Sequence, residues 1–496
     1  MSVLSFVQCH YFKKFSLPLQ QNRLHANECQ QNVLSQLISK GKNTDFGAKH
    51  HFKGITHYDD FKKNVPLRHY NDFVPFIEKI LNHEPSVLWP GLPSFFGKSS
   101  GTTETPKLLP VTNDFLSSTQ FAAGYILWNM AEQLHHTRFM GRKAFYLTDQ
   151  QRFEEVNGFL CGAISAIKAH RIPNWLRHFT LPGKEVNNIQ APALRVEATI
   201  NSIKGSDIRM AVALPVYLSH FLKQYEQKAG NTFKQDFPGF SVLFLSGMNY
   251  RPYENFLRQH MGDNIYILEN YSATEGSFAY QVVPNERGME LICNQGIFYE
   301  FIPLSEADKK EPLRLQLSEV ETGVSYSMII SSNSGLWAYV MNDIVEFVSV
   351  QPYRIIFNGR LKDIFSPFGE HMLPIQAEEA ITETCRQTNE TLVYFMLVPD
   401  FNYNSYRYKC YAEFDNELKD GFLFRTILHE QLCKCNSYID DLAKVGAFIM
   451  PELITVNKGF FHQILSKTTN LSAQQKITHL VSDKAIATLL KEMTGA

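Results

Sequence analysis

The chain has 496 residues, which is more than one compact core usually holds, so we expect two or three domains. Hydrophobic residues make up 44% of the chain and charged residues 20%, a composition that excludes a disordered protein. The formal net charge of −1 excludes the overall basic field of a typical nucleic-acid-binding protein.

The eight cysteines are scattered along the chain, and no pair has the two-residue spacing of common zinc ligands. This distribution favours reduced thiols in the core over a disulfide scaffold or a zinc site. The N-terminus lacks the charged region of a signal peptide, and the longest nearly apolar run, residues 121–131, is too short to span a bilayer. We therefore predict a cytoplasmic protein that does not enter a membrane.

The first 90 or so residues are expected to be mostly helical. Residues 27–41 repeat apolar side chains on one helical face and end at Gly41; these side chains are Val33, Leu34, Leu37 and Ile38. Residues 58–81 carry two short helical patterns, which we expect Pro66 and Pro75 to break.

From about residue 95 to residue 350, short apolar runs alternate with helical patterns. The runs KAFYLT, IRMAVAL, SVLFLSG and NIYILENYS are typical of buried strands, and PVYLSHFLKQYEQKAG is typical of a helix between them. This alternation predicts layers of an α/β fold. The last two of these strands end in small polar residues, where ligands gather in open α/β sheets.

The pattern changes at about Gly359, after which helices and strands indicate an α+β module. Helices are expected over PIQAEEAITETCRQTN and DGFLFRTILHEQLCKCN, and strands over TLVYFMLVPD and YKCYAEFD. We therefore predict an α/β protein with a large multi-layer N-terminal domain, residues 1–358, and a smaller α+β C-terminal domain, residues 359–496.

The stretch FFGKSSGTTETPKLLPVT, residues 95–112, is unusually rich in glycine, serine and threonine. Its Gly97-Lys98-Ser99 resembles the end of a Walker loop, but the preceding Gly91 lies one residue too far away and bulky residues intervene. A second interpretation is a loop whose hydroxyls and backbone N–H groups wrap phosphates, with Lys107 as an added positive charge. Taken alone, the loop is better explained as a solvated polar turn.

Three motifs downstream favour the phosphate-binding interpretation of this loop over the polar turn. The segment YSATEG, residues 271–276, offers a ring for stacking, a hydroxyl for a phosphate and a carboxylate for Mg²⁺. Asp343 follows an apolar segment and suits a pair of ribose hydroxyls, and GRLKDI begins at Gly359. Each motif also has a structural interpretation, as a core tyrosine, a carboxylate at a helix terminus, a turn cap or a surface charge pair.

In their order and spacing, these four motifs resemble the acyl-adenylate-forming superfamily of acyl-CoA ligases, nonribosomal-peptide adenylation domains and luciferases. The chain is more similar still to the auxin-responsive Gretchen Hagen three family of acyl-acid amido synthetases, and we expect a bacterial member. This resemblance covers nearly the whole chain, including LFLSGMNYRPYENF and the tail TNLSAQQKITHL. It implies ATP and Mg²⁺ as cofactors, and a C-terminal domain that rotates over the active site.

The resemblance also implies roles for individual residues. The triphosphate would be held by Ser99, Ser100, Gly101, Thr102 and Thr103, and the adenine would be lined by Ser246, Gly247 and Met248 and stacked on Tyr271. Thr274 would contact the α-phosphate, Glu275 would bind Mg²⁺, and Asp343 with Arg360 would hold the ribose. Lys476 would approach the reacting carboxylate, and Lys362 would be the hinge of the C-terminal domain.

The implied reaction is ATP-dependent activation of a carboxylic acid as acyl-AMP, followed by transfer to an amine such as an amino acid. The chain departs from the family pattern at Glu104 and Asn342, where glycine is usual, and at Thr478 and His479, where the family has Pro-Arg. Two alternatives therefore stay open: an acyl-CoA ligase, and a nucleotide-binding protein with a decayed catalytic site. The sequence identifies neither the acid nor the acceptor, and it indicates no protein partner.

Overall fold

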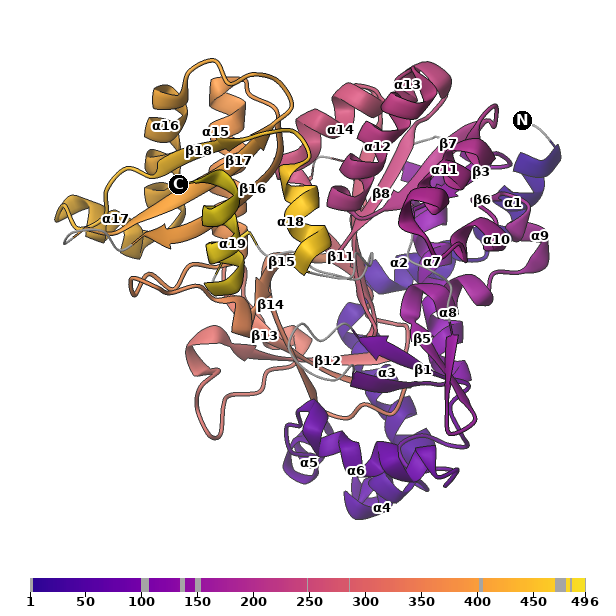
Figure 1. Cartoon of the computed structure of the whole chain (residues 1–496). Coiled ribbons are helices and arrows are strands. Elements are labelled where there is room, and N and C mark those ends of the chain that lie inside the picture. The colour runs from indigo at the N-terminus through magenta and orange to yellow at the C-terminus, as the bar shows by residue number, and fades with distance from the viewer. Residues whose placement is uncertain are drawn as a thin grey trace. The chain divides into compact units, whose positions relative to one another are not determined.

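The computed structural model describes residues 3–99, 107–133, 139–147, 153–247, 249–284, 286–400, 405–468, 479–481 and 484–495. The chain forms two compact units (Figure 1). The first contains Met1–Val212, Val242–Gly247 and Tyr266–Phe357. The second contains Ala213–Ser241, Met248–Ile265 and Asn358–Ala496, so it combines the C-terminal residues with two segments that we assigned to the large domain. The predicted domain boundaries stay a prediction.

The first unit is a mixed α/β structure. Its helices are α1 (Val3–Lys13), α2 (Ser16–Leu24), α3 (Ala26–Gly41), α4 (Asp45–Lys49), α5 (Tyr58–Asn64), α6 (Tyr70–Leu81), α7 (Asn113–Gln133), α8 (Ile164–His170), α9 (Asn174–Arg177), α10 (Lys184–Asn187) and α11 (Pro192–Ile203). Its strands are β1 (Phe95–Ser99), β2 (Lys107–Val111), β3 (Lys143–Tyr146), β4 (Phe153–Val156), β5 (Phe159–Ala163), β6 (Thr180–Leu181), β7 (Ile208–Ala213), β8 (Val242–Ser246), β9 (Tyr266–Ala273), β10 (Gly276–Tyr280), β11 (Met289–Leu291), β12 (Ile297–Pro303), β13 (Ser325–Ser332), β14 (Tyr339–Val350) and β15 (Tyr353–Arg360).

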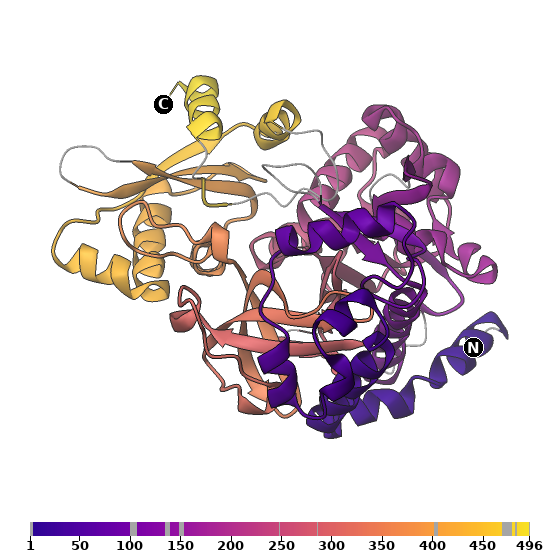
Figure 2. The same ribbon diagram turned by 90° about the horizontal axis from the view of Figure 1, so that it is seen from below.

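Two sheets organise these strands in the described part of the chain. The larger has the order β12-β13-β14-β15-β11-β10-β9-β8-β7-β3-β6, and the smaller has the order β2-β1-β5-β4. In the larger sheet, β8 runs parallel to β9, whereas β9 and β10 form an antiparallel hairpin. Figure 2 shows the indigo N-terminal helices lying across β12–β14, and Gln30 of α3 donates to the backbone oxygen of Ile297 at 2.9 Å.

The structure confirms most of the expected elements. The predicted apolar face of residues 27–41 is the buried face of α3, and the four strand-like runs between residues 143 and 273 form β3, β7, β8 and β9. Helix α12 (Pro215–Ala229) ends as expected at Gly230, which adopts a φ of +78° that only glycine tolerates well. The strand–helix alternation thus gives the α/β fold that the sequence predicts.

Pro75 does not break the second N-terminal helix, which was a wrong prediction. It lies inside α6, a helix that buries Phe73, Ile77 and Ile80. A proline in a helix removes one backbone hydrogen bond and costs about 3 kcal/mol. Burial of three large apolar side chains contributes about 1.5–3 kcal/mol each, so the helix continues past the proline.

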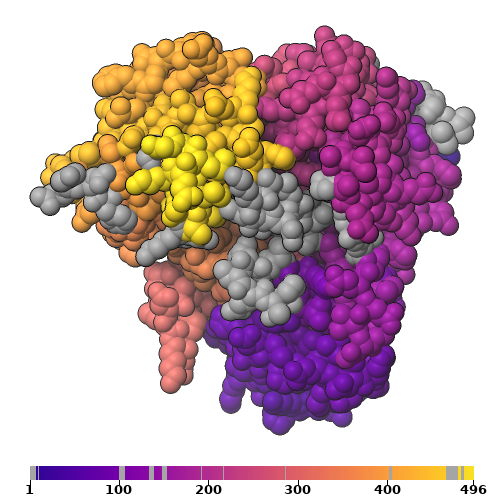
Figure 3. Space-filling model, viewed as in Figure 1, coloured from indigo at the N-terminus to yellow at the C-terminus, as the bar shows by residue number. Residues whose placement is uncertain are grey.

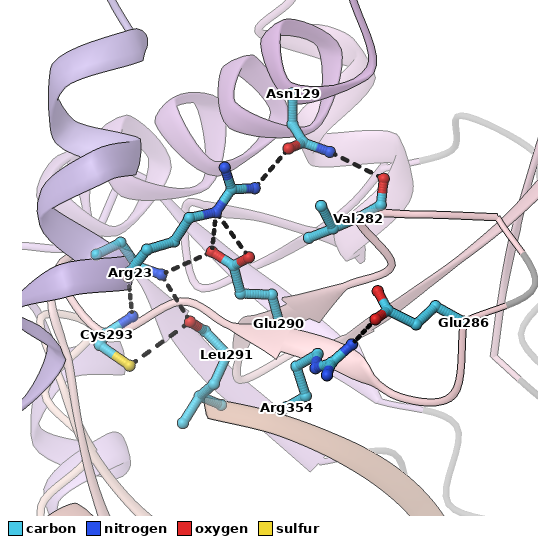
Figure 4. Close-up of polar contacts among 9 residues, drawn as sticks. Arg23, Asn129, Val282, Glu286, Glu290, Leu291, Cys293 and Arg354 are labelled. Atoms are coloured by element: carbon cyan, nitrogen blue, oxygen red, sulfur yellow. Dashed lines mark hydrogen bonds and ion pairs between the residues drawn. The ribbon is translucent and has the colours of Figure 1, made fainter. Parts of the chain in front are cut away.

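A buried polar network ties α2 to the sheet (Figure 4). The Arg23 guanidinium lies 2.9 Å from Glu290 Oε2 of β11, and its Nη2 donates to Asn129 Oδ1 of α7 at 2.5 Å. Asn129 in turn donates to the Val282 backbone oxygen at 3.2 Å. Burial raises the pKa of Glu290, and the neighbouring guanidinium opposes that rise. These contacts fix the N-terminal helices against the sheet that carries the candidate site.

The second unit is the predicted α+β module together with three helices from earlier in the chain. Its helices are α12, α13 (Phe233–Asp236), α14 (Glu254–Met261), α15 (Pro374–Thr388), α16 (Gly421–Cys435), α17 (Ser437–Lys444), α18 (Phe460–Thr468) and α19 (Lys484–Thr494). Its sheet has the order β16-β17-β18, formed by β16 (Leu392–Asp400), β17 (Arg407–Phe414) and β18 (Glu452–Val456). The expected helices and strands after residue 374 are confirmed.

Ion pairs join α12 and α14 to β17 within this unit. His260 of α14 lies 2.5 Å from Glu226 of α12 and 3.7 Å from Asp415, which follows β17. Burial disfavours the charged imidazole, but the contacts with Asp415 and Glu226 outweigh it and raise the pKa of His260. The His260 contact also lowers the pKa of Asp415.

Replacing His260 with asparagine should destabilise the protein in a pH-dependent way. Because its folded-state pKa is raised, His260 stabilises the fold fully below its unfolded pKa of about 6.5 and loses this contribution as the pH rises through the folded value. We expect a loss of about 1–3 kcal/mol in the free energy of unfolding at pH 6, shrinking towards pH 9. Urea denaturation at both pH values measures it, and an equal loss at pH 6 and pH 9 would contradict this explanation.

The described cysteine side chains are not joined in disulfides, as their scattered spacing predicts. Among the cysteines whose side chains the structure describes, seven are free thiols, namely Cys29, Cys161, Cys293, Cys385, Cys410, Cys433 and Cys435. Within the described ranges, no helix combines the length and apolar character that crossing a bilayer requires. The mixed-charge connection between β12 and β13 stands out from the surface of the first unit in Figure 3 (salmon), and its Lys309 and Lys310 are exposed.

Candidate active site

The described ends of the Gly/Ser/Thr-rich stretch form two strands, β1 and β2. Strands β1 and β2 pair antiparallel, and Ser99 lies opposite Lys107 at the end of the ladder. The predicted phosphate ligands Ser100, Gly101, Thr102 and Thr103, together with Glu104, lie outside the described residues. Lys107 places its amine 5.3 Å from the centre of the Tyr70 ring.

The rejection of a Walker loop is confirmed by Lys98. A Walker lysine stands at the start of a helix, whereas Lys98 lies within β1 and pairs with Leu108 of β2 and Ala163 of β5. Its amine forms an ion pair with Glu154 of β4. Lys98 is therefore engaged within the small sheet rather than directed into a phosphate loop.

Strands β8 and β9, which both end in small polar residues, are parallel neighbours and end side by side. Ser246 at the end of β8 is in register with Asn270 of β9, one residue before Tyr271. The next residue, Gly247, has a φ of +88°, a conformation that a side chain would disfavour. Met248 lies outside the described residues. The structure therefore brings two of the predicted adenine-lining residues next to the YSATEG segment.

Thr274 and Glu275 form the two-residue tip of the β9–β10 hairpin. Ala273 pairs with Gly276, so the hydroxyl and the carboxylate lie in the turn itself, where both are half-buried. Strand β1 reaches this turn from the other sheet. A Cβ atom added to Gly97 would lie 2.5 Å from the Thr274 methyl carbon, which is closer than real Cβ contacts come. The strand that leads into the Ser/Thr loop therefore touches the turn that carries Thr274 and Glu275.

Replacing Gly97 with alanine should push this turn away from β1. We expect acid-dependent exchange of pyrophosphate into ATP to fall about 10- to 100-fold, because displacements of about 1 Å at a reacting centre have effects of this size. Changing Thr274 to serine in the same protein removes the clashing methyl group and keeps the hydroxyl, so the double variant should recover most of the exchange. The single variant T274S is the control. Exchange by G97A within twofold of the unchanged protein would contradict the close approach.

Tyr271 and Asp343 form a buried pair. The Tyr271 hydroxyl donates to Asp343 Oδ2 at 2.5 Å, and the two residues are 6% and 1% exposed. The Tyr271 ring packs against Phe278 and Phe357, with ring centres 4.9 Å and 5.2 Å away. The residue before the aspartate, Asn342, has a φ of +60°, which explains why glycine would suit this position and why asparagine is tolerated. The hydroxyl thus orients the carboxylate that we predicted to hold the ribose.

The remaining predicted residues belong to the second unit. Arg360 ends β15, whose last three residues belong to the second unit, and is half-buried; Lys362 lies in the short 3₁₀ helix Leu361–Asp363 and is exposed. Lys476 lies outside the described residues. His479, three residues later, is buried, and burial lowers the pKa of its imidazole to about 4.

The surroundings of His479 show how the tail is attached. Its Nδ1 lies 3.0 Å from the Phe395 backbone oxygen, and its Nε2 lies 3.1 Å from the Tyr253 hydroxyl. The Leu397 backbone N–H donates to the His479 oxygen at 2.7 Å, which attaches the tail to β16. The family's arginine is therefore replaced by a neutral, buried anchor.

The site chemistry fits a magnesium nucleotide. Mg²⁺ in such sites is held by one or two carboxylates together with substrate phosphates, so the single half-buried carboxylate of Glu275 beside the Thr274 hydroxyl is a suitable protein ligand. No group of three or more His, Cys, Asp or Glu side chains suited to a metal occurs in the ranges that the structure covers. Such a site depends on the nucleotide for most of the metal's ligands.

Sequence reasoning missed two residues of this region. Gly97 was considered only as part of a Walker pattern, and its role as a contact point with Thr274 depends on the packing of two sheets. Lys168 of α8 carries no motif, yet its amine donates to Ser277 Oγ of β10 at 3.1 Å. Neither contact has a signal in the local sequence, because the partners are more than 100 residues apart.

Models of one known family match most of the chain. Residues 19–192, 290–360 and 375–485 match the GH3 family N-terminal, central and C-terminal domains. The chain is 22% identical to jasmonoyl–L-amino acid synthetase JAR4 of Nicotiana attenuata, over 90% of this chain and 89% of that protein. It is 35% identical to indole-3-acetic acid-amido synthetase GH3.15 of Arabidopsis thaliana, but over only 18% of this chain and 16% of that protein.

Solved structures of low sequence identity share the fold. The structure of AtGH3.15 acyl acid amido synthetase in complex with 2,4-DB has a TM-score of 0.78 at 16% identity, covering 97% of this chain and 96% of that one. A 2-hydroxyisobutyryl-CoA ligase in the postadenylation state has a TM-score of 0.58 at 13% identity, covering 97% and 92%. The acyl-adenylate-forming fold is thereby confirmed. Because the three family models cover more than half of its length, this chain belongs to the GH3 family.

Proposed function

We propose that this protein is an ATP-dependent acyl-acid amido synthetase. It activates a carboxylic acid as acyl-AMP and then transfers the acyl group to an amine, which we take to be an amino acid. The observation that supports this most is the contact between Gly97 of β1 and Thr274 of the β9–β10 turn, which joins the proposed triphosphate loop to the proposed α-phosphate contact. The family that the chain belongs to agrees with the same chemistry.

In the first step a carboxylate oxygen of the acid attacks the α-phosphorus, and the bond to pyrophosphate breaks. The proposed triphosphate ligands are Ser99, Ser100, Gly101, Thr102 and Thr103, assisted by Lys107. Thr274 contacts the α-phosphate, and Lys476 approaches the reacting carboxylate. Their contribution is positioning and neutralisation of charge, which is the main source of catalysis in phosphoryl chemistry.

The remaining nucleotide contacts are proposed from the same resemblance. Ser246, Gly247 and Met248 line the adenine with Tyr271, and Asp343 holds the ribose with the help of Arg360. Glu275 is the proposed Mg²⁺ ligand, and the bound ion would supply positive charge to the phosphates. The contacts of Tyr271 with two phenylalanines and its bond to Asp343 hold both residues in fixed positions.

In the second step the amine nitrogen attacks the acyl carbonyl carbon, the bond to AMP breaks, and one proton leaves the nitrogen. We propose that the C-terminal residues turn about Lys362 between the two steps, so that the acceptor reaches the adenylate. The relatives are named for jasmonoyl and indole-3-acetic acid conjugation, which supports an acid with an apolar body and an amino acid acceptor. We also propose a cytoplasmic location, which the free thiols support.

The first step is tested by exchange of labelled pyrophosphate into ATP across a library of aromatic, jasmonate-like and straight-chain carboxylic acids. The proposal predicts exchange that needs both the acid and Mg²⁺. Absence of exchange with every acid in the library would favour the decayed nucleotide-binding protein instead. The same library identifies the acid.

A further inference from the structure

A half-buried lysine lies beside the candidate site without a negatively charged partner. Lys168 of α8 donates to Ser277 Oγ at 3.1 Å, and this serine belongs to β10, directly after the Thr274–Glu275 turn. Burial lowers the pKa of the Lys168 amine to about 8. In the part of the chain that the structure describes, the serine hydroxyl is the hydrogen-bond partner of this amine, and no carboxylate lies within ion-pairing distance of it.

Some half-buried lysines of the chain are paired with carboxylates, whereas Lys62 and Lys143 donate to backbone oxygens. Lys223, whose side chain is 19% exposed, lies 3.0 Å from Glu413, and Lys98 pairs with Glu154. Removing an ammonium group from water without a counter-charge is unfavourable, and such groups are usually paired or functional. Lys168 differs from Lys62 and Lys143 in its place beside the Thr274–Glu275 turn, where a bound substrate would supply a negative charge.

The position of Lys168 limits which negative charge this is. Ser277 pairs with Ser272 across the β9–β10 hairpin and is the second residue of β10, so it lies close to the turn that carries Thr274. A carboxylate that attacks the α-phosphorus must lie within about 3–3.5 Å of it, so it occupies the space next to the α-phosphate.

We propose that the Lys168 ammonium group binds the carboxylate of the acyl acid and holds it for attack on the α-phosphate. This inference rests on the proposed function, because it assigns Thr274 to the α-phosphate. Ser277 would keep the amine directed at the hairpin while the acid is absent. The lysine of α8 would thereby recognise the acid at its charged end.

The test compares K168M, K168R and the unchanged protein by binding and by turnover. Methionine keeps the length of the side chain and removes the charge. We expect the Kd and the KM of the acid to rise about 10- to 100-fold in K168M, as expected for the loss of a charge-assisted hydrogen bond. The KM of ATP should stay within twofold. K168R should retain most of the affinity, and K204M, at an exposed lysine of the same unit, should change neither constant.

Two further measurements separate this inference from the proposed function. The first is calorimetric titration of the library acids without ATP, which needs no turnover. If an acid binds and K168M weakens its binding while pyrophosphate exchange is absent, the proposed function is contradicted and the role of Lys168 in binding the acid is retained. The neutral primary amide of the same acid should bind the unchanged protein and K168M equally. An unchanged Kd of the acid in K168M, or a rise confined to the KM of ATP, would overturn the assignment, and the thermal midpoint of K168M checks that the variant is folded.

Discussion

Changing Glu275 to glutamine is expected to lower acid-dependent pyrophosphate exchange by at least about 100-fold. The substitution keeps the size of the side chain at the tip of the β9–β10 hairpin and removes the charge that we propose for Mg²⁺. Loss of one group that stabilises developing phosphate charge has effects of about 10²- to 10³-fold in other enzymes. A higher Mg²⁺ concentration should restore part of the activity, since weaker metal binding is then compensated by mass action.

Glu286 offers a matched control for this variant. It is an exposed acid of the same unit that pairs with Arg354, so the variant E286Q changes the same charge away from the site. It should leave the exchange rate unchanged within twofold. Full exchange by E275Q at the usual Mg²⁺ concentration would remove Glu275 from the metal site.

Replacing Glu300 with alanine is expected to have the largest effect on stability. Glu300 of β12 is fully buried and lies 2.7 Å from the Arg314 guanidinium, which is 6% exposed. Tyr58 of α5 donates to the same carboxylate at 2.9 Å, and Arg314 Nη1 donates to the Val65 oxygen at 2.7 Å. Removing one partner leaves a buried charge without compensation, and this costs about 3–5 kcal/mol in the free energy of unfolding.

The double variant E300L/R314M provides the comparison. Replacing both charges with apolar groups of similar volume is often neutral, because it removes the cost of desolvation together with the ion pair. Urea denaturation should therefore show a smaller loss for the double variant than for E300A. An E300A protein as stable as the unchanged one would contradict the burial of this pair.

The sequence patterns that predicted the fold are local and periodic. The apolar face of α3 and the strand runs of β8 and β9 depend on neighbouring residues, so they could be recognised without tertiary information. Pro75 was misjudged because the burial of one face of α6 outweighs a single lost hydrogen bond. The grouping of residues 213–241 and 248–265 with the C-terminal residues could not be predicted either, since contacts such as His260 with Asp415 join distant segments.

In the candidate site, too, some residues could be predicted from the sequence and others could not. Thr274, Glu275 and Asp343 could be found because motif order and spacing are written in the chain. The bond from Tyr271 to Asp343 depends on how distant strands of the larger sheet are placed, and the contact of Gly97 with Thr274 depends on how the two sheets meet. His479 was noted only as a departure from the family tail, and its role as a buried anchor on β16 emerged from the structure.

The central claim is that the acyl group of a preformed adenylate passes to an amine. The most direct test incubates the enzyme with ATP, Mg²⁺ and the acid identified by exchange, divides the mixture, and adds either the twenty amino acids or CoA. Mass spectrometry then follows the products within a single turnover. We predict an amide of the acid with an amino acid, one AMP for each amide, and no thioester; a thioester with CoA and no amide with any amino acid would contradict the account.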